Sequence, residues 1–148
     1  SDEWRATTEQ WRTILGNQAQ PPLDRLRNLV HSFLYSEVEE AAVRVALDDA
    51  APLYRDAVES QEIHSEGDRI IEAFMADTLP DAPLAKRQLV GDLLVMTMTS
   101  VGKEISETPK TKAEIDAYAE TMSDMFDTYL RSLQCERSTP VAAASTQM

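Results

Sequence analysis

Apolar residues recur at helical spacing through most of the chain, and the clearest pattern lies between Leu84 and Leu133. This segment predicts two consecutive amphipathic helices, and the first carries apolar side chains on more than one side. Such a helix has more apolar surface than the core of one small domain can cover. We therefore expect it to be buried twice, once inside its own domain and once against another chain, most simply a symmetric copy.

Two further helices are predicted near the N-terminus. Apolar residues fall at helical spacing over 4–15, and the pattern ends at Gly16. A second helix is expected to begin at Pro21 and Pro22, because the first turn of a helix tolerates the missing N–H of proline. Its apolar stripe continues to Leu34.

The middle of the chain predicts two more helices. Ser36 is a candidate N-cap because Glu39 follows three residues later, and this pair predicts a short third helix over 38–46. Pro52 marks the next break. A long fourth helix is predicted from about Tyr54 to Leu79, where two prolines follow within four residues and stop it.

The last two helices are separated by a short connection. The fifth is predicted from Leu84 to about Glu107. Thr111 and Glu114 have the spacing of a capping box, which marks the start of the sixth helix and its stripe from Ile115 to Leu133. Because the connection is short, the two helices are expected to be antiparallel neighbours.

Length and composition agree with a single all-α domain. The chain has 148 residues and only 4 glycines, which leaves few turn residues for an all-β fold. We predict an all-α bundle of about six helices over 1–135 and a flexible tail over 136–148. The sequence has no membrane-spanning run and no signal-peptide pattern, so a cytoplasmic location is expected. The single Cys135 is compatible with a reducing compartment.

The chain is strongly acidic, with a formal net charge of −12. Between Glu37 and Asp81 there are thirteen acidic residues and three basic ones, Arg44, Arg55 and Arg69. Such a surface repels phosphate backbones, so this part of the protein is not expected to bind nucleic acid. The acidity has two interpretations: a solvated surface that maintains solubility, or a pocket that attracts cations.

The sequence lacks the common signatures of catalysis and metal binding. The 4 glycines are far apart, which excludes a local phosphate-binding loop. A di-iron bundle needs Glu three residues before His, whereas Asn28 precedes His31 and Gln61 precedes His64 at that spacing. We therefore predict no catalytic residue, no metal site and no cofactor.

A helical enzyme remains an alternative from a different functional class. It would use carboxylates for acid–base chemistry, and the candidates are Asp48, Asp49, Glu62 and Glu66. The chain offers no partnered nucleophile, metal set or cofactor loop to support it.

Aromatic and methionine positions on the predicted helices suggest a cavity for a small molecule. His31 has Arg27 and Tyr35 one turn away, a group that suits either ligand orientation or a solvated helix flank. Methionines fill cores, and their pliancy also suits pockets for apolar molecules. The candidate ligand-binding residues are Trp11, His31, Tyr35, Tyr54, Phe74, Met75, Met96 and Met98.

Three segments resemble the C-terminal half of TetR/AcrR-family transcriptional regulators: APLYRDAVESQEIHSEGDRIIEAFMADTLPDAP, LVGDLLVMTMTSVGKEISETPKTKAEIDAYAETM and DMFDTYLRSL. The resemblance covers about Trp4 to Leu133. It implies a helical domain that binds a small effector and dimerises, preceded in the family by a helix-turn-helix domain that binds an operator. No basic helix-turn-helix pattern precedes Trp4 here, so we expect DNA binding, as in a repressor, to reside in a part of the parent protein outside this sequence.

The resemblance also implies that the last two helices pair with those of a second copy in a dimeric four-helix bundle. The candidate interface residues are Leu94, Val101, Ile105, Tyr118, Met122, Met125, Phe126 and Tyr129. The helix over 1–15 would transmit effector-induced motion to the DNA-binding domain. A protein-interaction module without a small-molecule ligand, whose pairing is its whole function, is the alternative.

Overall fold

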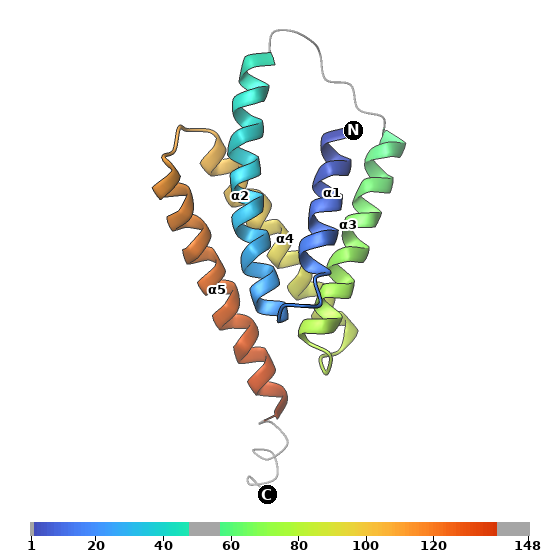
Figure 1. Ribbon diagram of the computed structural model, residues 1–148. Coiled ribbons are helices and arrows are strands. Elements are labelled where there is room, and N and C mark those ends of the chain that lie inside the picture. Colours follow the sequence, from blue (N-terminus) through green and yellow to red (C-terminus); the bar gives the residue numbers. More distant parts are fainter. Residues whose placement is uncertain (1, 48–56, 139–148) are drawn as a thin grey trace, which may run out of the picture.

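The computed structural model describes residues 2–47 and 57–138, which form five α-helices (Figure 1). The helices are α1 (Asp2–Leu15), α2 (Pro22–Leu47), α3 (Ala57–Thr78), α4 (Leu84–Ser106) and α5 (Lys112–Ser138). No strand occurs in these two ranges, so the predicted all-α class is confirmed. None of these helices has the length and apolar character needed to cross a membrane.

The predicted break before the third helix is wrong. α2 is continuous from Pro22 to Leu47, so the second and third predicted helices are one helix, and Ser36 lies inside it. Ser36 and Glu39 match a capping box by spacing alone, since no proline or glycine near them stops the helix. Pro52 and Tyr54 lie outside the described residues.

The start of α5 is confirmed in atomic detail. The backbone N–H of Glu114 donates to Thr111 Oγ1 at 3.1 Å, and the Thr111 N–H donates to Glu114 Oε1 at 2.8 Å. These reciprocal bonds form the capping box that the sequence predicts. The backbone hydrogen bond from Thr111 also lowers the pKa of Glu114 from its ordinary value, because it favours the charged carboxylate.

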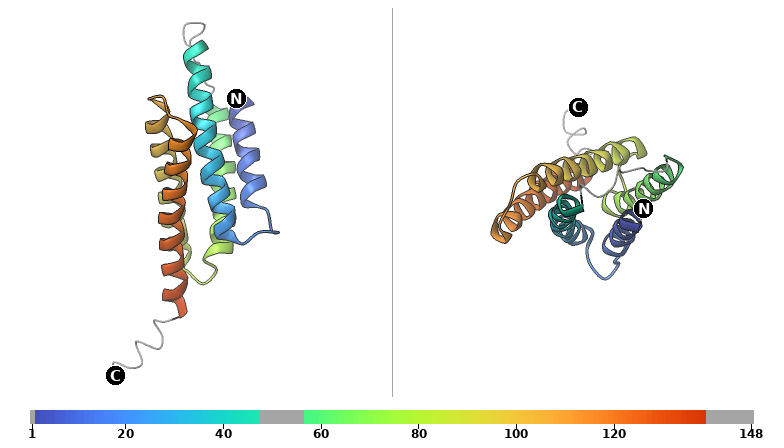
Figure 2. Two further views of the ribbon diagram at one scale, coloured as in Figure 1. Left: turned by 60° about the vertical axis from the view of Figure 1, so that its left-hand side comes forward. Right: turned by 90° about the horizontal axis from the view of Figure 1, so that it is seen from above.

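α2 is the central helix of the bundle. It packs against all four other helices, while α3 packs mainly against α1 and α4. In both views of Figure 2, α4 and α5 lie on one side of α2, and α1 lies on the other. The core is correspondingly rich in α2 residues, and Leu29, Val30 and Leu34 are fully buried. Trp11 of α1 contacts Phe33 edge to face, with ring centroids 5.9 Å apart.

Gly102 permits a close approach between α4 and α2. A Cβ atom at this position would lie 2.9 Å from Phe33 Cε2 and 2.9 Å from Glu37 Cγ. Glycine inside a helix costs about 1 kcal/mol relative to alanine, and the close contact between the two helices offsets that cost. The methyl group of an alanine would fit at this position only if both neighbouring side chains moved.

α4 presents apolar side chains on two separate faces, as its sequence predicts. Val90, Leu94, Met98 and Ile105 are buried in the core. On a different side of the same helix, Leu89, Leu93 and Met96 are exposed. The described residues of the chain therefore cover only one of the two apolar faces.

Candidate functional site

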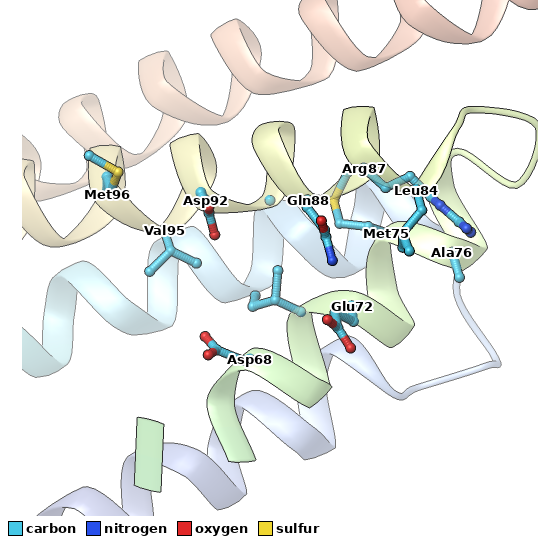
Figure 3. Close-up of a pocket in the computed structure, with 12 residues that line it drawn as sticks. Asp68, Glu72, Met75, Ala76, Leu84, Arg87, Gln88, Asp92, Val95 and Met96 are labelled. Atoms are coloured by element: carbon cyan, nitrogen blue, oxygen red, sulfur yellow. The ribbon is translucent and has the colours of Figure 1, made fainter. Parts of the chain in front are cut away.

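A cavity of about 550 Å³ opens between α3 and α4 (Figure 3). Small-molecule sites in proteins have volumes of about 300–1,000 Å³, and this cavity falls within that range. Its apolar lining consists of Ile71, Met75 and Ala76 from α3 and Leu84, Gly91, Val95 and Met96 from α4.

Gly91 brings the two walls of the cavity close together at its floor. A Cβ atom at this position would lie 2.9 Å from Ile71 Cγ2 and 3.3 Å from Met75 Cγ. Met75 is fully buried beneath the cavity, and Ile71 is partly buried. The absence of a side chain at Gly91 therefore allows α3 and α4 to pack tightly here and to share one apolar floor.

The polar lining of the cavity is mostly acidic. Asp68 and Glu72 belong to α3 and Asp92 to α4, and all three are exposed. None of these carboxylates makes an ion pair or a hydrogen bond with a side chain that the structure describes. Arg87 is the one basic residue among the described lining residues, and its buried Nε has no hydrogen-bond partner among them or elsewhere in the described part of the chain. The charges of the cavity are thus available to a ligand.

Two of the residues predicted to bind a ligand line this cavity, namely Met75 and Met96. Trp11, Phe74 and Met98 are buried in the core of the bundle instead. The five polar lining residues were not among the candidates. In the sequence these residues resemble the solvated side of a helix. The one signal that could have identified them is their helical spacing from Met75 and Met96, which places them next to the same apolar groove.

His31 and Tyr35 lie away from the cavity, in a polar ladder between α2 and α5. The ladder consists of Arg27, His31 and Tyr35 on α2 and of Asp116, Glu120 and Asp124 on α5. The residues are four apart on each helix, and the two sets pair in opposite directions along the antiparallel helices.

The distances in the polar ladder show close pairing. Arg27 donates to Glu120 at 2.6 Å and to Asp124 at 2.7 Å, and His31 Nε2 lies 2.7 Å from Glu120 Oε2. The Tyr35 hydroxyl donates to the Asp116 carboxylate, and this bond raises the pKa of Tyr35 to about 12. These side chains hold α5 on α2, so they are engaged within the bundle.

A second set of polar contacts joins α3 to the end of α1. The guanidinium of Arg25, which is only 4% exposed, donates to the Leu15 carbonyl at 3.3 Å and to Asp77 at 3.1 Å. Arg12 pairs with Glu66 at 2.6 Å and lowers the pKa of that carboxyl. A smaller cavity of about 240 Å³ lies along this contact.

A family model described as the tetracycline repressor-like C-terminal domain matches residues 21–133. The chain belongs to this family. The match extends from the start of α2 into α5, so the TetR-like domain includes both walls of the α3–α4 cavity. Domains of this family belong to regulators rather than to enzymes. A search of curated proteins finds no match to the sequence.

The residues predicted for the dimer interface of the TetR-like domain fall into two groups. Leu94, Ile105, Met122 and Phe126 are buried inside the protomer, and Val101 is partly buried against the core. Tyr118, Met125 and Tyr129 are exposed on α5. The exposed Leu89 and Leu93 of α4 were not among the candidates, because helical spacing alone does not tell which of two apolar faces is the inner one.

Among the side chains that the structure describes, no group of three or more from His, Cys, Asp or Glu is arranged to hold a metal ion. The carboxylates of Asp68, Glu72 and Asp92 therefore share one cavity without forming a coordination site. The apolar floor and the charged walls of the cavity suit the binding of a molecule by apolar contact and charge.

Proposed function

We propose that this TetR-like domain binds a small-molecule effector in the cavity between α3 and α4. The observation that carries the proposal is a cavity of about 550 Å³ with an apolar floor and with carboxylates on its walls that no described side chain pairs. The parent protein would be a cytoplasmic transcriptional regulator, with DNA binding performed by a helix-turn-helix domain outside this sequence.

The position of α3 supports a route from the cavity to α1. One part of α3 lines the cavity with Glu72 and Met75, while Glu66 and Asp77 of the same helix pair with Arg12 and Arg25. An effector that changes the distance between α3 and α4 would also change the position of α1. The effector acts by binding one arrangement of the helices more tightly than another, and a tenfold difference in affinity supplies about 1.4 kcal/mol.

We also propose that the domain dimerises through an outer apolar face. This face consists of Leu89, Leu93 and Met96 on α4 and of Tyr118, Met125 and Tyr129 on α5, and these side chains are between 42% and 62% exposed. The two helices lie on the same side of α2 (Figure 2). Large apolar side chains gathered on one surface are typical of protein interfaces. In the parent protein, dimerisation would set the spacing of two recognition helices on an operator.

The cavity proposal is tested by a thermal-shift screen of lipophilic compounds against the wild type and two variants. Ala76→Phe fills the cavity, whereas Ala117→Phe places the same side chain at an exposed position of α5 outside it. A compound at a hundred times its Kd stabilises the folded protein by about 2.7 kcal/mol, which raises the midpoint by several degrees.

We expect active compounds to stabilise the wild type and Ala117→Phe but not Ala76→Phe. If no compound stabilises the wild type, or if Ala76→Phe responds as the wild type does, the cavity is not an effector site. The alternative of an interaction module without a ligand would then be favoured.

A further inference from the structure

We propose that the effector of the α3–α4 cavity is an amphipathic organic cation, with an apolar body on the floor and a positive group among the carboxylates. This inference rests on the proposed function of the cavity, because it specifies the chemical class of the ligand that binds there. The argument uses the charge, position and pairing of the lining residues.

The lining carries three carboxylates, Asp68, Glu72 and Asp92, and one guanidinium, that of Arg87. None of the three forms an ion pair with Arg87 or with another side chain of the described ranges. Their negative charges therefore act on whatever enters the cavity. A positive ligand group is attracted by about 1 kcal/mol per close contact even at the dielectric constant of water, and an anion is repelled by a similar amount.

The charges are separated along the cavity (Figure 3). Asp68 on α3 and Asp92 on α4 lie on the side of the cavity where Val95 and Met96 are drawn, and Glu72 lies between Asp68 and the Arg87 end. The Arg87 side chain lies at the other end, beside Leu84. A cation at the end formed by Asp68 and Asp92 is therefore close to negative charge and distant from the one positive lining group.

The apolar floor indicates that the cation is organic. Ile71, Met75 and Val95 offer no ligand atoms to an inorganic ion, and the carboxylates are not arranged as a metal site within the described residues. An apolar body that covers these side chains removes their surface from water, which contributes about 25 cal/mol per Å². Charge and apolar contact together select an amphipathic cation over a neutral or anionic molecule of the same shape.

The test compares three fluorescent probes that share one pyrenylbutyl body and end in an ammonium, a hydroxyl or a carboxylate. Binding to the intact chain is followed by the fluorescence of the pyrene at low and at moderate salt. We expect the ammonium probe to bind about tenfold more tightly than the hydroxyl probe, which corresponds to about 1.4 kcal/mol. Its affinity should fall with added salt, whereas that of the hydroxyl probe should not.

A matched pair of triple variants separates the local charge from the net charge. The first combines Asp68→Asn, Glu72→Gln and Asp92→Asn. The second combines Asp81→Asn, Glu104→Gln and Glu107→Gln, which neutralises three exposed acids outside the cavity. The first variant should lose the preference for the ammonium probe, and the second should keep most of it.

Three results would overturn the inference in different ways. If the three probes bind the wild type equally and Ala76→Phe prevents binding, the cavity is a ligand site but not one for cations. If Ala76→Phe leaves the binding of every probe unchanged, the probes bind elsewhere and the proposed function of the cavity fails as well. Tighter binding of the carboxylate probe would instead assign the selectivity to Arg87.

Discussion

The surroundings of each helical glycine determine what a methyl group at that position would do. A Cβ at Gly67 of α3 would meet nothing within 4 Å, whereas a Cβ at Gly102 of α4 would lie 2.9 Å from both Phe33 and Glu37. The same substitution should therefore have opposite effects at the two sites. Intrinsic helix propensity dominates at the first position, and steric overlap between helices dominates at the second.

We expect Gly67→Ala to stabilise the protein by up to about 1 kcal/mol, which is the difference in helix propensity. Gly102→Ala should destabilise it by about 1–3 kcal/mol, because Phe33 must move within a packed core. Both changes in stability are to be measured by urea denaturation at one fixed protein concentration, because dimerisation would make the midpoint depend on concentration. Equal stabilisation by the two variants would show that α4 and α2 are not in close contact at Gly102.

Arg25 is the nearly buried cation that ties the end of α1 to α3. Replacing it with Ala removes the donor to the Leu15 carbonyl and the charged donor to Asp77, which keeps only the weaker hydrogen bond from Gln18 Nε2 at 3.3 Å among the described side chains. We expect Arg25→Ala to lower the free energy of unfolding by about 1.5–3 kcal/mol, the range for hydrogen bonds to charged groups. Arg69→Ala is the control, because that side chain is exposed and pairs only with Glu66 in the described ranges. A similar small effect for both variants would contradict this role of Arg25.

At the scale of helices, the sequence predicts the ends best where a local signal sets them. The capping box at Thr111 and Glu114 and the proline before Leu84 give the starts of α5 and α4 to within a residue. The same type of signal is misleading at Ser36, because a serine and a glutamate three apart also occur inside a continuous helix. Whether such a pair caps a helix depends on the preceding residues, which here favour continuation.

The polar ladder between α2 and α5 gives a prediction at the same scale. In this ladder the Tyr35 hydroxyl donates a hydrogen bond to Asp116, and this bond raises the pKa of Tyr35 to about 12. A group with a raised pKa contributes stability that is fully present below its unfolded pKa of about 10 and is lost as the pH rises toward about 12. The ladder should therefore hold α5 on α2 at neutral pH and weaken in strong alkali.

Spectrophotometric titration of tyrosinate absorbance checks this expectation. The wild type should contain one tyrosine that ionises about two pH units above the ordinary value, and Tyr35→Phe should remove that step. Asp116→Asn keeps the shape of the partner but removes its charge, so it should move the step toward lower pH. A titration curve that Tyr35→Phe does not alter at its alkaline end would contradict the pairing with Asp116.

At the scale of the whole molecule, the sequence predicts the fold class and the surplus apolar surface but only part of the candidate site. Met75 and Met96 are identified as candidates because methionine suits pockets, yet Phe74 and Met98 have the same character and lie in the core. The cavity arises from the way α3 and α4 pack around Gly91, which neither helix encodes alone. Distinguishing wall from core therefore requires the relative placement of two helices.

The outer apolar face leads to a prediction about the oligomeric state. We expect sedimentation velocity to show a dimer for the wild type and a monomer for the double variant Leu93→Glu and Met125→Glu, because both substitutions would bury charge between two copies. Val43→Glu is the matched control, since Val43 is 50% exposed but lies on α2, away from this face. It should remain dimeric, and circular dichroism should show unchanged helicity in all three proteins.

Replacing Met122 or Phe126 with Glu tests the inner face of α5, which packs on the core. Both side chains are buried in the core, so Met122→Glu and Phe126→Glu should unfold the domain rather than release folded monomers. This difference separates the inner face of α5 from the outer face that carries Met125. A wild type that sediments as a monomer at high concentration would show that the exposed residues of α4 and α5 do not pair two copies. Folded monomers of Phe126→Glu would show instead that Phe126 belongs to the interface between them.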